Sequence, residues 1–535
     1  MATKGSGASV PVRERRKSVE ARLAALGTPG RPLRTPPPSG RLGADRYATP
    51  ALCAALPELG PLFAGFGRYL GGRPDLVARR DGRELLAIPD EAPSMSAADV
   101  DACIAHHLGR PRHQVFFEFD HTPRIIGLWS ECFDAWLAPG VPVSVTVVRP
   151  GVDAHLVDAP LLELLQPWFD VPAQAFRAAI DDFLQGLGRR LDQAAQAAAF
   201  ATLAADASRL GDVLGAPVVF RDHCAPGVLT LERCSAESVA DLRGSMHRPG
   251  PAESHGADLG RRITLAWLRL ATRGQIVPYD FTEDDILVDG NRLLLRDAAF
   301  EPHSAGARRG WLGYLTALSD DDPEAAADWM LAGAPGPAAE QHEEGLRRRL
   351  RQAVPFRDGE WSGEDRLGEL ALAQWRMAQL AGWPLSQSHV RLYRGLYAVQ
   401  TVVTALAPRE DALVAALRDE RFQAGLDSLR QVLDPLGPAA SARFREALSM
   451  PRAIDGLLTL ASEGRLRVNI DVPEGKQARD TRNRTVMLMA TLVALTGIAM
   501  VARDVAPALG FTAERLAAVV VLVLGGWLLV AAARM

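Results

Sequence analysis

The C-terminal end of the chain constrains its fold most. Thr485–Ala502 and Leu516–Ala533 are apolar runs without a charged residue. Each has about 18 residues, close to the length with which a helix spans a bilayer. Because a short loop, Arg503–Arg515, separates them, we expect residues 484–534 to form two transmembrane helices joined as a hairpin. The alternative is a buried apolar hairpin in a soluble fold.

Basic residues predict how this hairpin is oriented. Lys476, Arg479, Arg482 and Arg484 precede the first run, and Arg534 follows the second. Positive charges close to a membrane span favour the cytoplasmic side. We therefore expect the main domain and the C-terminus in the cytoplasm, attached to the inner (cytoplasmic) membrane, with membrane lipids as partners.

Composition excludes several classes of protein. A net charge of -4 and an aromatic content of 6% are not typical of nucleic-acid binding, so we expect no nucleic-acid partner. The five cysteines include no Cys-x-x-Cys pair, which argues against structural zinc and a disulfide framework. Residues 1–50 contain a stretch rich in Pro, Gly and Arg, and we expect a disordered basic extension there.

The body of the chain is mostly helical in its pattern, with a few strands. Residues 141–148, 218–222 and 228–233 are rich in Val, Leu and Thr, and we expect a strand at each. Between the first two, residues 176–210 predict one long amphipathic helix. Along 141–148, period-2 alternation places the valines on one face and Ser144 and Thr146 on the other.

Residues 277–297, VPYDFTEDDILVDGNRLLLRD, combine a predicted hairpin with regularly placed acids. The hairpin covers 285–297 and turns at Gly290-Asn291. Asp280, Asp285 and Asp297 have the order of the catalytic loop and metal-binding Asp of a kinase-like ATP site. Their structural alternative is a loop carboxylate or turn cap. An EF-hand is excluded, because neither the required Gly nor the required Glu is present.

Several further segments resemble one family in their order along the chain. They are LGPLFAGFGRYLGGRPDLV (59–77), FFEFDHTP (116–123), VSVTVVRPGV (143–152), LTLER (229–233) and DDILVDGNRLLLRD (284–297). The first is similar to the N-terminal extension of that family, and the second to the segment that precedes its nucleotide loop. The third is similar to its phosphate-pairing strand, the fourth to its hinge and the fifth to its metal motif. The chain thus resembles the UbiB/AarF-type atypical kinase-like family, which is associated with isoprenoid quinone biosynthesis.

The resemblance implies an α+β class, a mostly helical, two-lobed protein-kinase-like fold with a helical N-terminal extension and a C-terminal transmembrane helical hairpin. The implied domains are a helical extension at 51–115, a small lobe at 116–235 and a helical large lobe at 236–470.

The resemblance also implies a site for ATP and Mg²⁺. Asp280 would be the catalytic base or water-positioning residue, and Asp285 and Asp297 would bind the metal. The implied cofactor-binding positions are Thr146, Asp192 and Glu232.

The chain departs from the family pattern where phosphate would bind. Thr146 stands where the family has the phosphate-pairing Lys, and Ile125–Leu128 replaces a loop of small residues. Asp285 also replaces a metal-binding Asn, and each like-charge pair at about 4 Å costs on the order of 4 kcal/mol at an effective dielectric near 20. Arg149 is the nearest substitute cation, but period 2 turns it to the valine face.

Two functions are compatible with these features. The first is a membrane-anchored pseudokinase or scaffold that supports ubiquinone lipid biosynthesis, with isoprenoid quinone precursors or quinone-biosynthesis proteins as partners. The alternative is an active ATPase or small-molecule kinase with rearranged phosphate and metal ligands. Whether the chain is an enzyme depends on whether another basic group reaches the site.

Overall fold

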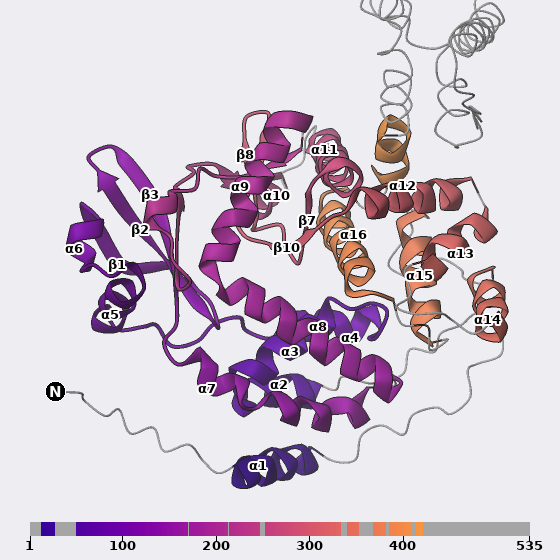
Figure 1. Ribbon diagram of the computed structural model, residues 1–535, viewed down its shortest axis with the longest axis horizontal. Coiled ribbons are helices and arrows are strands. Elements are labelled where there is room, and N and C mark those ends of the chain that lie inside the picture. Colours follow the sequence, from indigo (N-terminus) through magenta and orange to yellow (C-terminus); the bar gives the residue numbers. More distant parts are fainter. Residues whose placement is uncertain are drawn as a thin grey trace, which may run out of the picture. The chain divides into compact units, whose positions relative to one another are not determined.

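The computed structural model describes the following residues of the chain: 12–26, 50–169, 171–211, 213–246, 252–320, 322–332, 340–351, 367–380, 383, 385–407 and 412–420. The described residues between 12 and 416 belong to one compact unit, and Figure 1 draws them in colour. The two apolar runs predicted to span the membrane lie outside the described residues. Within the described part, no helix combines the length and apolar character that crossing a membrane requires.

An antiparallel sheet forms the core of the small lobe. Its strands, in the order in which they pair, are β1 (Glu118–Ile126), β2 (Ser130–Ala138), β3 (Val141–Val148) and β5 (Val228–Glu232). The predicted strands at 141–148 and 228–233 are confirmed, and Val143, Val145 and Val147 lie buried on one face. The predicted strand at 218–222 is wrong. Val219 makes only an isolated bridge, because the chain turns into η2 (Arg221–His223).

The helix predicted at 176–210 is two helices, α8 (Ala173–Leu191) and α9 (Gln193–Leu210). The break falls at Asp192, whose carboxylate accepts hydrogen bonds from the backbone N–H groups of Ala194 and Ala195, both at 3.1 Å. Asp is a favoured N-cap because it satisfies donors that the new helix leaves free. Two short helices, α7 (Val152–Leu156) and η1 (Ala159–Trp168), connect β3 to α8.

Helices also make up the extension that precedes the sheet. They are α2 (Pro50–Leu59), α3 (Pro61–Gly71), α4 (Arg79–Leu86), α5 (Ala97–Leu108) and α6 (Arg112–Val115). Aromatic side chains of α3 pack into one apolar core with α8, where Phe66 meets Phe176 and Phe183 with ring centroids 5.6 and 5.3 Å apart. The extension is therefore part of the folded body.

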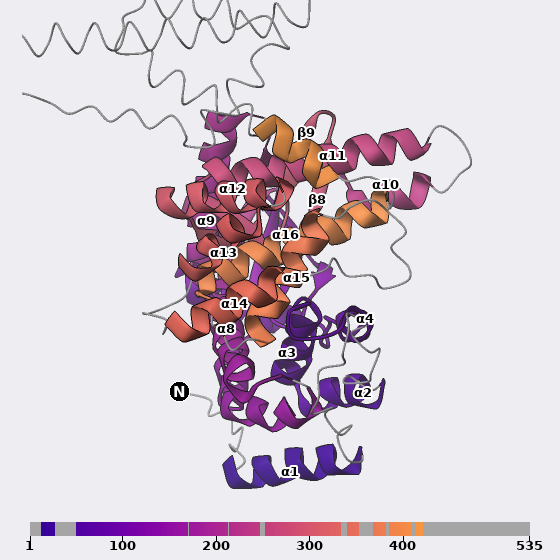
Figure 2. The same cartoon turned by 90° about the vertical axis from the view of Figure 1, so that its right-hand side faces the viewer.

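The prediction that residues 1–50 are disordered is wrong for α1 (Val12–Ala25), which lies alongside α2 in Figures 1 and 2. Val19 and Leu23, one turn apart, are buried in the same core as Leu59. Arg15 pairs with Asp158 at 2.7 Å. Two buried residues and one ion pair order a helix whose composition is otherwise polar. The Pro-rich stretch that follows lies outside the described residues.

The large lobe contains a second sheet and a two-stranded ribbon. In the sheet, β4 (Leu214–Gly215), β9 (Arg292–Leu295), β8 (Ile286–Asp289) and β6 (Glu237–Ser238) pair in that order. The predicted hairpin is confirmed, with Gly290 at a φ of 57° in its turn. The ribbon joins β7 (Ile276–Tyr279) to β10 (Ala299–Pro302).

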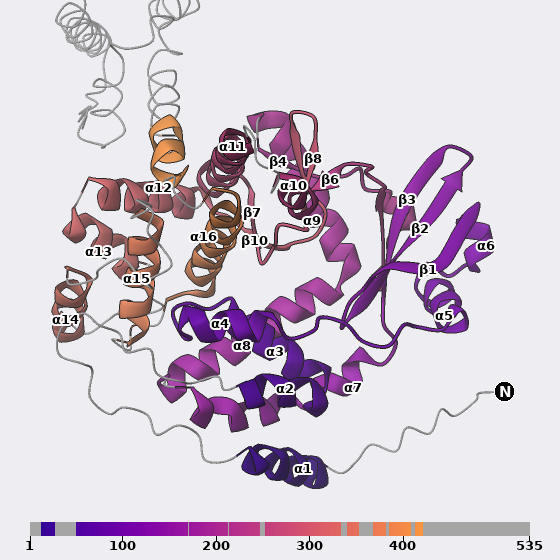
Figure 3. The same cartoon turned by 180° about the vertical axis from the view of Figure 1, so that it is seen from behind.

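The helices of the large lobe are α10 (Val239–Met246), α11 (Ala252–Arg273), α12 (Ala305–Ser319), α13 (Pro323–Ala332), α14 (Glu340–Arg351), α15 (Leu367–Leu380) and α16 (Gln387–Leu406). Figure 3 shows α16 beside α11 and β7, and these three elements pack against one another. A helix from the end of the described chain is thereby placed next to the segment that carries Asp280.

Candidate functional site

Asp280 directly follows β7 and has an unusual backbone. Its φ of 53° makes it the one non-glycine residue with positive φ among the described residues. Left-handed backbone is disfavoured for most residues but tolerated by Asp, and such residues are concentrated at functional sites. The carboxylate of Asp280 has a protein partner, because the guanidinium of Arg394 on α16 donates to its Oδ2.

Arg394 also connects Asp280 to α8 and to the extension. Its Nη1 donates to Asp182 Oδ2 at 2.9 Å. Its guanidinium lies over the rings of Tyr69 and Tyr279, 4.5 and 5.1 Å from the ring centroids. One turn earlier on α16, Arg391 pairs with the other oxygen of Asp182 at 3.2 Å.

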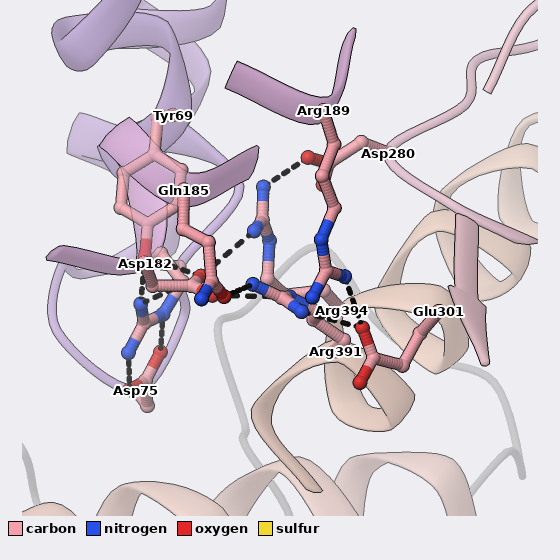
Figure 4. Close-up of polar contacts among 10 residues, drawn as sticks. Tyr69, Asp75, Asp182, Gln185, Arg189, Asp280, Glu301, Arg391 and Arg394 are labelled. Carbon is pink, nitrogen blue, oxygen red and sulfur yellow. Dashed lines mark hydrogen bonds and ion pairs between the residues drawn. The ribbon is translucent and has the colours of Figure 1, made fainter. Parts of the chain in front are cut away.

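Figure 4 shows the resulting network, which we name the Asp182 cluster. Its members are Tyr69, Arg73, Asp75, Asp182, Gln185, Arg189, Asp280, Glu301, Arg391 and Arg394. Four arginines and four carboxylates give the cluster a formal charge of 4 − 4 = 0. No cation is left over within it to attract a polyphosphate.

Burial and pairing oppose each other at Asp182. Burial would raise the pKa of this carboxyl group, but the charges of Arg394, Arg73 and Arg391 and a hydrogen bond from Tyr69 outweigh it, so its pKa lies below the ordinary value. Burial alone would lower the pKa of Arg394, whereas Asp280 and Asp182 raise it above its usual range. Each charge is stabilised by its neighbours, as buried ion pairs require.

The two predicted metal ligands are both occupied by protein donors. Asp285 Oδ2 accepts from the backbone N–H and the hydroxyl of Thr282, both at 2.8 Å, so Asp285 does act as a turn cap. Asp297 pairs with Arg190, from the last turn of α8. Burial, and then the charge of Asp297, raise the pKa of Asp285 to about 6.

These residues as arranged do not fit a magnesium site. Mg²⁺ takes an octahedral set of oxygen ligands, usually one or two carboxylates with waters and phosphates. Here a guanidinium holds Asp297. Across the part of the chain that the structure describes, no group of three or more His, Cys, Asp or Glu side chains is placed to hold a metal ion.

On the phosphate side, Thr146 of β3 lies opposite Cys132 of β2. The expected substitute cation, Arg149, is bound elsewhere. It pairs with the buried Glu131 at 2.8 Å and donates to the carbonyls of Gly127 at 2.9 Å and Pro93 at 2.7 Å. Arg149 thereby joins the segment before α5 to the β1–β2 turn.

The other two predicted cofactor-binding residues have structural partners. Asp192 is the N-cap of α9, which explains its conformation without a bound cofactor. Glu232, at the end of β5, accepts a hydrogen bond from the backbone N–H of Val218 at 3.2 Å. A role for either residue in binding a nucleotide stays a prediction.

No sequence pattern points to Arg190 and Arg394, the two arginines that pair with Asp297 and Asp280. Arg190 is separated from Asp297 by 107 positions, and Arg394 from Asp280 by 114. Arg190 belongs to a pair of arginines at the end of an amphipathic helix, which signals a charged terminus but not which acid it meets. Arg394 has no local signal beyond being a charged residue within a long apolar helix.

Comparison with known proteins identifies the domain. The model of the ABC1 atypical kinase-like domain matches residues 87–294. Two similar relatives are each named "Probable protein kinase UbiB", from Pseudomonas fluorescens (strain SBW25) and Pseudomonas entomophila (strain L48). They are 29% and 30% identical over 200 residues, which is 35% of this chain and 36% of each relative. The chain thus matches about a third of the length of these relatives.

A solved structure, the complex of Rv3197 with erythromycin from Mycobacterium tuberculosis, is 16% identical and has a TM-score of 0.37. The similarity covers 60% of this chain and 85% of that one. The range matched by the family model holds the small-lobe sheet, α8 and the segment with Asp280 and Asp285. Residues 87–294 therefore form a domain of the ABC1 atypical kinase-like family, in a chain with a mostly helical, kinase-like fold, and the chain is similar over about a third of its length to relatives named UbiB.

Proposed function

We propose that this chain is a membrane-anchored pseudokinase or scaffold that supports ubiquinone lipid biosynthesis without turning over ATP. The family membership and the name UbiB of its relatives support the pathway. The apolar runs 485–502 and 516–533 support attachment to the inner membrane, with the kinase-like body in the cytoplasm. Membrane lipids, isoprenoid quinone precursors and quinone-biosynthesis proteins are its proposed partners.

The observation that carries this proposal is the engagement of Arg149. Phosphoryl transfer depends on positioning and on cations that stabilise the phosphates. Thr146 is neutral, and Arg149 is held by Glu131 and two backbone carbonyls. Pulling Arg149 away would leave the carboxylate of Glu131, which is 1% exposed, without its guanidinium partner. That loss costs several kcal/mol when a buried pair is broken.

The state of Asp280 supports the same conclusion. A catalytic base must reach the proton that it removes, within about 3 Å. One oxygen of Asp280 already accepts from Arg394, and Arg394 is itself bound to Asp182 at 2.9 Å. Freeing this oxygen for a substrate hydroxyl requires rearrangement of a buried network.

The second candidate function is that of an active ATPase or small-molecule kinase of the same family. It is favoured by the placement of Asp285 beside the segment that carries Asp297, where the backbone N–H of Arg296 donates to the carbonyl of Asp285 at 2.7 Å. Two neighbouring carboxylates are a minimal set for Mg²⁺ with a nucleotide. This function requires Arg190 to leave Asp297 when the nucleotide arrives.

A nucleotide titration of the full chain in detergent separates the two functions. We expect no binding of ATP at millimolar concentration, with or without Mg²⁺, which corresponds to less than about 4 kcal/mol of binding free energy. Saturable, magnesium-dependent binding that Asp297→Asn abolishes would contradict this expectation, and hydrolysis of the bound ATP would then establish the active enzyme. Asp289→Asn is the matched control, because Asp289 is an exposed acid of the same hairpin, 3.9 Å from Arg292.

A further inference from the structure

Arg190 pairs with Asp297, one of the two acids expected to bind magnesium. It lies in the last turn of α8, beside Arg189. The two arginines serve different acids, since Arg189 pairs with Glu301 at 2.6 Å whereas Arg190 donates to Oδ2 of Asp297. The end of one helix therefore delivers one cation to the Asp182 cluster and a second to the predicted metal site.

The second acid of that site is satisfied without a metal. Asp285 accepts two hydrogen bonds from Thr282 at its Oδ2, both at 2.8 Å. The backbone N–H of Arg296 donates to the carbonyl of Asp285 at 2.7 Å, which holds Asp285 next to the segment that carries Asp297. A fixed pair of carboxylates is thus assembled by the protein alone.

A guanidinium and a magnesium ion differ in what they demand of such a site. Mg²⁺ needs about six oxygen ligands at 2.0–2.1 Å and keeps several waters. A guanidinium stays protonated at any physiological pH and needs only oxygen acceptors in its plane. Because Arg190 supplies a permanent positive charge at Asp297, it removes the repulsion that would otherwise require a divalent ion.

We propose that Arg190 takes the place of the magnesium ion in this kinase-like site, so that the site keeps its two acids without binding a divalent metal. This inference rests on the proposed non-catalytic function, because a magnesium-dependent enzyme would have to displace Arg190 from Asp297. In this inference, one side chain from α8, that of Arg190, is the reason that the site does not bind magnesium.

The test is the thermal unfolding of the full chain in detergent, with MgCl₂ as the only added ligand. For the unchanged protein we expect the same midpoint in EDTA and in millimolar MgCl₂. Arg190→Ala leaves two neighbouring acids without their cation, so its midpoint should be lower and should rise by about 2–4 °C with Mg²⁺. Arg177→Ala is the matched control, because Arg177 is on the same helix in an exposed pair with Glu163 at 3.1 Å. We expect no metal response from it.

Two results would overturn the inference. One is a midpoint of the unchanged protein that rises saturably with MgCl₂. The other is an Arg190→Ala protein that folds and ignores Mg²⁺. If Arg190→Ala does not fold, calorimetric titration of the unchanged chain with MgCl₂ still shows whether the site binds magnesium, and heat of saturable binding would overturn the inference. The unfolding midpoint of Arg190→Lys should not change with MgCl₂. Because no nucleotide is present, magnesium binding here rejects only the role of Arg190. ATP hydrolysis without magnesium would reject the proposed function and leave that role intact.

Discussion

The small-lobe sheet and the Asp182 cluster each have a buried centre, but they are stabilised in different ways. On the sheet, Phe133, Val143, Val145 and Val147 are fully buried in one apolar layer, and β1, β2 and β3 pair with their neighbours in sequence. The cluster joins charged side chains that are far apart along the chain. Asp182, for example, is 212 positions from Arg394.

The difference teaches how each region responds to change. Apolar packing is non-directional, so a truncated side chain costs roughly the transfer free energy and the cavity that it leaves. A buried ion pair is balanced, because each charge offsets the desolvation of the other. Removing one member of the cluster leaves the charges of its partners buried and unpaired, so the protein bears their full desolvation free energy. Truncating a side chain of the sheet lowers the free energy of unfolding in proportion to the apolar group that is removed.

The largest effect should come from Asp182→Ala. This change leaves Arg391 and Arg394 short of a carboxylate and the buried Tyr69 hydroxyl without its acceptor at 2.9 Å. Breaking a buried pair costs about 3–5 kcal/mol, and we expect a loss of that size in the free energy of unfolding, measured by urea denaturation. The exposed pair of Arg177, tested by Arg177→Ala, should change stability by less than about 1 kcal/mol. Equal effects of the two variants would contradict the comparison.

Acid should destabilise the large lobe through two histidines, the buried His303 and the half-buried His389. Burial lowers the pKa of His303 to about 4, and burial together with the charge of His303 does the same for His389. Both are neutral in the fold, while the unfolded chain binds protons below about pH 6.5. Stability should therefore fall as the pH drops from about 6.5 to 4, by on the order of 3 kcal/mol for His303.

The measurement is the midpoint of urea unfolding at several pH values, for the unchanged chain and for His303→Gln. The variant should lose much of the dependence between pH 6.5 and 4, because a neutral side chain then replaces the titrating one. A pH profile that is the same with and without His303 would show that other groups control acid unfolding.

Sequence patterns predicted the elements whose causes are local. The alternation in 141–148 and the turn signal Gly290-Asn291 each depend on neighbouring residues, and both are confirmed. The strands at 118–126 and 130–138 were missed, because Glu118, Asp120 and Glu131 interrupt their apolar pattern. The role of Asp192 as the N-cap of α9 was missed as well, because the predicted helix ran through this position.

The candidate site was only partly predictable for the same reason. The order of Asp280, Asp285 and Asp297 along the chain is visible in the sequence. The arginines that meet Asp280 and Asp297 come from α16 and α8, and only tertiary packing brings them there. Charge pairing at such separations has no periodic signal. The three acids can therefore be named as candidates from the sequence, but the arginines that pair with two of them cannot.

The smallest of these effects, in the apolar sheet, tests whether loss there stays proportional. Val145 is fully buried on β3 between Phe133 and Thr230. Val145→Ala removes two methyl groups, worth about 0.8 kcal/mol each, and leaves a small cavity, so the free energy of unfolding should fall by about 2 kcal/mol. Thr146→Val changes the half-buried opposite face and should cost far less. If Val145→Ala cost as much as Asp182→Ala, the sheet would depend on each member as strongly as the ionic cluster, and the distinction between the two regions would fail.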